Sequence, residues 1–87
     1  MMIQIEKKEV TEYATYFELS TEKKAAFVGI DKSGTVQVIC KNAAHAAYRG
    51  QGKFFDSIGE AVAAYKSSAM QEMIRTAAQE TLHCVEA

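Results

Sequence analysis

Residues 25–40, with the sequence AAFVGIDKSGTVQVIC, are the stretch that decides the fold. Two runs of apolar and β-branched residues flank the tetrapeptide DKSG at 31–34. Asp opens turns by hydrogen bonding to the backbone that follows it, and Gly closes them because it tolerates a positive φ. The pattern therefore predicts a β-hairpin with its turn at Asp31–Gly34.

The register of this hairpin follows from the turn. If Asp31 pairs with Gly34, Phe27 lies opposite Val38 and Gly29 lies opposite Val36. Phe27 would then share the core face with Val36, Val38 and Cys40. Gly29 weakens a strand unless something packs closely over it, and a crossing helix is the ordinary explanation. We therefore predict that Phe27→Ala costs about 3–5 kcal/mol.

Further strands and a short helix are predicted around the hairpin. Ile3 and Ile5 alternate with polar residues, which indicates a short first strand, and residues 13–19 alternate in the same way. After the hairpin, Asn42 and Gly50 bracket an alanine-rich run that predicts a two-turn helix over 43–49. Residues 53–55 are expected to form a short strand or an extended stretch.

The C-terminal third is predicted to be helical. Ser57 and Glu60 form a capping-box pattern. Apolar residues then recur at spacings of three and four, which predicts a helix from about 58 to about 84. Two consecutive helices joined at Ser67–Ser68 are the alternative. The expected fold is α+β: an antiparallel sheet of three or four strands, a long C-terminal helix packed on one face and the short Ala-rich helix.

The length of the chain limits what it can do. Its 87 residues predict one domain, 1–87. A chain this short buries about 60% of its unfolded surface, so most apolar side chains are needed for the core. Little remains for a deep catalytic pocket, whereas a binding protein works with its surface. We therefore expect a binding protein, with no catalytic residues and no cofactor.

Composition and charge narrow the setting. The sequence has no apolar run long enough to span a membrane and no apolar segment of a secretion signal, so we expect a cytoplasmic protein. The net charge is −1, but basic residues dominate 23–53 and acidic residues dominate both ends. Such segregation can build a field over one face, unless the segments pair with each other.

The soft metal ligands do not form a known site. Cys40 and His45 are five residues apart, and His83 and Cys84 are neighbours that diverge on a helix. We therefore expect no metal. A Cys40–Cys84 disulfide stays open as an alternative, although the lack of a secretion signal disfavours it.

A basic loop is the most distinctive polar motif. In RGQGK at 49–53, two glycines flank an amide between two cations, and glycines let backbone amides approach a ligand. The motif lacks the residues of a nucleotide-binding P-loop. A helix end followed by a turn is the alternative. The candidate anion- or nucleic-acid-binding residues are Lys41, Tyr48, Arg49, Gly50, Gly52 and Lys53.

A second candidate surface is acidic and aromatic. Acids on the predicted strands and long helix could meet a basic partner, with aromatic side chains as anchors. Its candidate residues are Glu12, Tyr16, Glu18, Glu72 and Glu80. Met70 and Met73, with Tyr65, form either a partner-binding face or an ordinary core stripe.

Three segments carry a resemblance: NAAH at 42–45, YRGQGKFF at 48–55 and EAVAAYKS at 60–67. They are similar to small uncharacterised accessory proteins of bacteriophages and prophages. This resemblance implies a non-enzymatic interaction protein of the anti-CRISPR kind, which binds and inhibits a host defence component. The implied partner is a host protein or protein–nucleic-acid complex. The alternative is a nucleic-acid or nucleotide-binding module that uses residues 41–53. A homodimer stays open.

Overall fold

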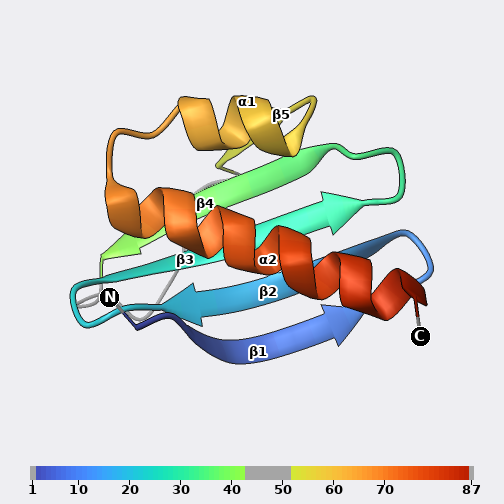
Figure 1. Ribbon diagram of the computed structural model, residues 1–87, viewed down its shortest axis with the longest axis horizontal. Coiled ribbons are helices and arrows are strands. Elements are labelled where there is room, and N and C mark those ends of the chain that lie inside the picture. Colours follow the sequence, from blue (N-terminus) through green and yellow to red (C-terminus); the bar gives the residue numbers. More distant parts are fainter. Residues whose placement is uncertain (1, 43–51, 87) are drawn as a thin grey trace.

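The computed structural model describes residues 2–42 and 52–86, with the side chains of 2–40 and 52–81. Within these residues, five strands form one antiparallel sheet in the order β1-β2-β3-β4-β5, and two helices follow them in the chain. Figure 1 shows both helices on one face of the sheet. The strands are β1 (Gln4–Val10), β2 (Ala14–Ser20), β3 (Lys24–Asp31), β4 (Val36–Asn42) and β5 (Lys53–Phe55); the helices are α1 (Ile58–Ala63) and α2 (Ser68–Glu86).

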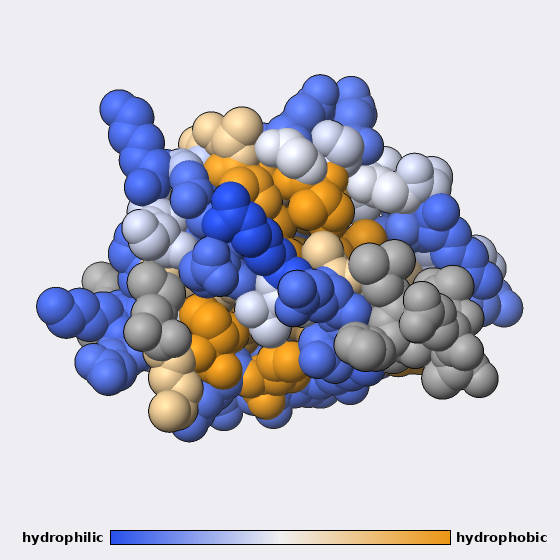
Figure 2. Space-filling view, in the orientation of Figure 1, coloured by the Kyte–Doolittle hydropathy of each residue, from blue (hydrophilic) through white to orange (hydrophobic). Residues whose placement is uncertain are grey.

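The α+β class is confirmed, and in the described part of the chain the sheet has five strands where three or four were expected. The core lies between the sheet and α2, which packs against β2 and β3. Alternate residues of the strands point into it because side chains of a strand alternate between faces. In Figure 2 the outer side of α2 is largely hydrophilic, with hydrophobic side chains on both sides of it. The largest fully buried side chains are Phe17, Leu19, Val28, Val36, Val38, Met73 and Ile74.

The predicted register of the β3–β4 hairpin is wrong by one residue. Phe27 lies opposite Ile39, and Val28 lies opposite Val38. The predicted turn at Asp31–Gly34 is present, since the Gly34 amide donates to the Asp31 carbonyl (3.1 Å). The strand pairing nevertheless closes one residue later, because the Asp31 amide donates to the carbonyl of Thr35 (3.0 Å). A shift of one residue moves every side chain of the strand to the other face.

Phe27 therefore lies on the face away from the helices, and the expectation that it belongs to the core is corrected. Its ring stacks on that of Tyr16, with the centroids 5.6 Å apart. Tyr16 also explains Gly29, because a Cβ at that position would lie 2.8 Å from Cδ1 of Tyr16. A neighbouring ring, and not a crossing helix, requires the glycine. The large loss of stability predicted for Phe27→Ala does not follow from this position.

The C-terminal region consists of two helices, so the alternative at Ser67–Ser68 is confirmed and a continuous helix over 58–84 is wrong. The Ser67 hydroxyl accepts a hydrogen bond from the Met70 amide (3.4 Å), as an N-cap residue does. The Gln71 side chain donates a hydrogen bond to the Tyr65 carbonyl (2.7 Å). This bond gives a partner to a backbone carbonyl in the link between the helices. No helix within the described residues is both long and apolar enough to cross a membrane. The helix expected over 43–49 lies outside the described residues.

The predicted cap by Ser57 is confirmed, whereas Glu60 reaches back to Asp56, one residue before the N-cap. Its hydroxyl accepts from the Glu60 amide (3.1 Å), and the Glu60 carboxylate accepts from the Asp56 amide (3.2 Å). Ser57→Ala should lower the free energy of unfolding by about 1 kcal/mol, because it frees an amide at the start of α1. Urea unfolding measures the change. Ser68→Ala, an exposed serine at the start of α2, is the control, and an equal loss in both variants would contradict the capping role.

Candidate anion-binding site

The residues of the predicted basic loop are only partly described. Tyr48, Arg49 and Gly50 lie outside the described residues, as does the side chain of Lys41. Gly52 has a φ of 70°, which suits glycine. Lys53 lies in β5 opposite Val38, so its side chain is on the face that carries the helices.

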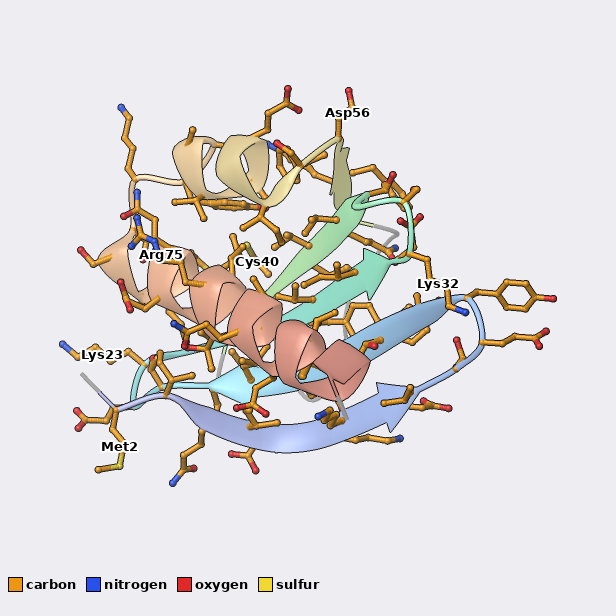
Figure 3. All side chains as sticks on the ribbon, turned by 45° about the vertical axis from the view of Figure 1, so that its right-hand side comes forward. Met2, Lys23, Lys32, Cys40, Asp56 and Arg75 are labelled. Atoms are coloured by element: carbon orange, nitrogen blue, oxygen red, sulfur yellow. The ribbon has the colours of Figure 1, made fainter. Side chains whose placement is uncertain are left out.

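Lys53 belongs to an open hollow of about 550 Å³ at one end of the sheet. There β3 begins, β4 ends, and the link between α1 and α2 passes overhead. Figure 3 shows Lys23 at the end of the molecule where α2 begins, and Cys40 between the two helices. We call this hollow the lysine pocket; its lining residues are Lys23, Lys24, Ala25, Cys40, Lys53, Ala64, Tyr65, Lys66, Ser67 and Met70.

Four lysines line the lysine pocket: Lys23, Lys24, Lys53 and Lys66. All four residues are exposed, and none makes an ion pair with another described residue. None of the described lining residues is acidic. Cations gathered without a counter-charge build a positive potential that attracts anions, and a concave surface focuses that potential.

The floor of the lysine pocket is less polar. The Cys40 thiol lies 3.9 Å from the sulfur of Met70, and the Tyr65 ring makes an edge contact with Phe55 (6.1 Å between centroids). Burial, together with the neighbouring Cys40, raises the pKa of Tyr65 to about 12. The phenol therefore stays protonated at neutral pH and can donate a hydrogen bond to an anion. The lysine pocket thus joins a cationic rim to a partly apolar floor.

The start of α2 adds to the positive potential. Ser67 and Met70 both line the lysine pocket, and the first turn of α2 contains no acidic residue. The amide groups of a first helical turn carry partial positive charge. This contribution reinforces the lysines, which carry the full charges.

The structure does not bring the acidic candidates together. Tyr16 and Glu18 lie on the face away from the helices, opposite Gly29 and Phe27. Glu12 is exposed in the turn between β1 and β2.

The acids of α2 lie on the other side of the sheet and are paired. Glu72 pairs with Arg75 (2.8 Å), and Glu80 pairs with Lys8 (3.9 Å). Met70 and Met73 are buried, which confirms the core stripe and not a partner-binding face.

Sequence reasoning missed most of the lysine pocket, namely Lys23, Lys24, Lys66, Tyr65 and Cys40. The available signal was the excess of basic residues over 23–53, which includes three of the four pocket lysines. Among the described residues, no three His, Cys, Asp or Glu side chains gather as metal ligands would.

No protein-family model matches the chain, and no curated protein or solved structure matches it.

Proposed function

We propose that the protein is a non-enzymatic binding module for a phosphate-bearing ligand, either a nucleotide or nucleic acid, held in the lysine pocket. One observation carries this proposal: four lysines line one hollow whose described lining contains no acid. Lysine ammonium groups bind phosphate as point charges, and each well-formed contact is a charge-assisted hydrogen bond.

We rank this function above presentation of acids to a basic partner. The candidate acids lie on both sides of the sheet, and those on α2 already have cationic partners. A partner surface could engage only some of them at once. The lysines of the pocket, by contrast, all line one hollow of ligand size.

The resemblance to phage accessory proteins supplies a setting for the proposal. In the cytoplasm of a bacterial host, a module of this kind would inhibit a defence component by occupying or removing its phosphate-bearing ligand. The proposal about the lysine pocket does not depend on this setting.

Cys40 makes the lysine pocket directly testable, because its thiol lies on the floor. In a Cys84→Ser background, which leaves Cys40 as the remaining thiol, the alkylation rates with anionic iodoacetate and neutral iodoacetamide are compared. The positive potential should raise the iodoacetate-to-iodoacetamide ratio about threefold or more relative to a Lys53→Ala/Lys66→Ala variant. The difference should vanish in about 1 M salt, where charges are screened within about 3 Å.

Pyrophosphate is the matching probe of binding. It should slow alkylation of Cys40 by neutral iodoacetamide in the protein with intact lysines and not in the variant. Equal rate ratios in the two proteins, together with no protection by pyrophosphate, would contradict the proposed function.

A further inference from the structure

A second hollow lies beside the lysine pocket and shares two of its residues. It encloses about 360 Å³ and is lined by Met2, Thr21, Glu22, Lys23, Lys24 and Ala69. Lys23 and Lys24 therefore stand between two hollows. Both hollows reach the first turn of α2, one at Met70 and the other at Ala69. We call Lys23 and Lys24 the lysine ridge.

We propose that the ligand is a dinucleotide unit whose linking phosphate lies on the lysine ridge and whose two bases enter the two hollows. This inference rests on the proposed function and specifies its ligand. Each hollow is within the size range of small-molecule sites, about 300–1,000 Å³. A single phosphate would engage the ridge and leave both hollows unfilled.

The lining of the two hollows favours bases over further phosphates. In the lysine pocket, the half-buried Tyr65 ring offers an aromatic surface to a base. In the second hollow, Met2 and Ala69 supply apolar contact.

Glu22 favours a base over a phosphate in the second hollow. Its carboxylate repels a phosphate there but can accept a hydrogen bond from the amino group of a base. The part of the ligand that enters the second hollow must therefore carry little negative charge.

The test compares ApA, a dinucleoside monophosphate, with AMP by isothermal titration calorimetry. AMP carries a charge of about −2 at neutral pH, and the phosphodiester of ApA carries about −1. Attraction to the lysines alone would favour AMP. If both hollows take a base, ApA should bind about tenfold more tightly in spite of its lower charge, because its second base adds apolar contact in the second hollow to the stacking of the first base on Tyr65.

A substitution in the second hollow tests whether this hollow is the source of the tighter binding of ApA. Met2→Ser removes an exposed apolar side chain from this hollow, so it should weaken ApA binding more than AMP binding and abolish the preference for ApA. Val10→Ser is the matched control: Val10 is 61% exposed against 72% for Met2, and it lies outside both hollows. The control should keep the preference for ApA.

The outcomes separate the two proposals. Lysine-dependent binding of AMP that equals or exceeds that of ApA would overturn the dinucleotide assignment and leave the anion pocket standing. An eight-nucleotide single strand that binds far more tightly than ApA at equal salt would also overturn it, in favour of a longer groove. If pyrophosphate, AMP and ApA all fail to bind, both proposals fall.

Discussion

Replacing Phe17 by alanine is expected to lower the free energy of unfolding by about 3–5 kcal/mol. The Phe17 side chain is 0% exposed and lies in the core between β2 and the helices. Its removal leaves a cavity that the neighbouring strands cannot close, because Phe17 is held in register with Lys8 on one side and Val28 on the other. The loss approaches the whole stability of a small domain, about 5–15 kcal/mol. Urea unfolding followed by circular dichroism measures it.

Phe27→Ala is the matched control, since the same side chain is removed from the opposite face. Phe27 is only partly buried and stacks on Tyr16, so a smaller loss is expected. Because a strongly destabilised Phe17 variant could fail to fold, Phe17→Leu provides a milder second measurement at the same position. A larger loss for Phe27→Ala than for Phe17→Ala would contradict the register of the sheet.

The elements of the fold were predictable from local sequence, whereas the register of the hairpin was not. Residues 25–30 form a continuous apolar run, so alternation could not show whether Phe27 or Val28 faces the core. The deciding contact is the Asp31 carboxylate, which accepts from the amides of Ser33 and Thr35 (both 2.9 Å). These hydrogen bonds hold Thr35 in the loop, so the loop is one residue longer than predicted. Hydrogen bonds from Ser33 above all lower the pKa of Asp31, so the carboxylate stays charged in the turn.

The break between the helices shows a similar limit. The apolar stripe continues across Ser67 with helical spacing, so the pattern alone was compatible with one helix. In the structure, the Ser67 cap and the hydrogen bond from the Gln71 side chain to the Tyr65 carbonyl stabilise the break between α1 and α2. This break brings Lys66 and Tyr65 to the lysine pocket.

The candidate site was harder to predict because its charges are assembled by tertiary structure. Lys23 comes from the turn between β2 and β3, Lys24 from the start of β3, Lys53 from β5, and Lys66 from the link between the helices. No short motif joins residues so far apart. The sequence showed only that the middle of the chain is basic, and of the candidate anion-binding residues Lys53 alone lines the lysine pocket in the described part of the chain.

Removal of the lysine ridge should have the largest effect on binding. Lys23→Ala/Lys24→Ala deletes two charges that border both hollows. A hydrogen bond to a charged group contributes about 1.5–3 kcal/mol when well formed, so the double variant should bind ApA or AMP about 100-fold more weakly or worse. Isothermal titration calorimetry at low and high salt measures the loss, and the affinity of the original protein should fall with salt.

The control must remove the same net charge elsewhere. Lys7→Ala/Lys32→Ala does so, since Lys7 lies on β1 and Lys32 lies in the β3–β4 turn, at the other end of the molecule from Lys23 (Figure 3). Both pairs are exposed, so neither should change stability by more than about 0.5 kcal/mol per residue. A diffuse attraction would weaken binding equally in the two variants. A localised phosphate site weakens it only when the ridge is removed, because short contacts are specific and long-range attraction between exposed charges is screened. Equal losses would therefore reduce the lysine pocket to one contributor among the surface charges.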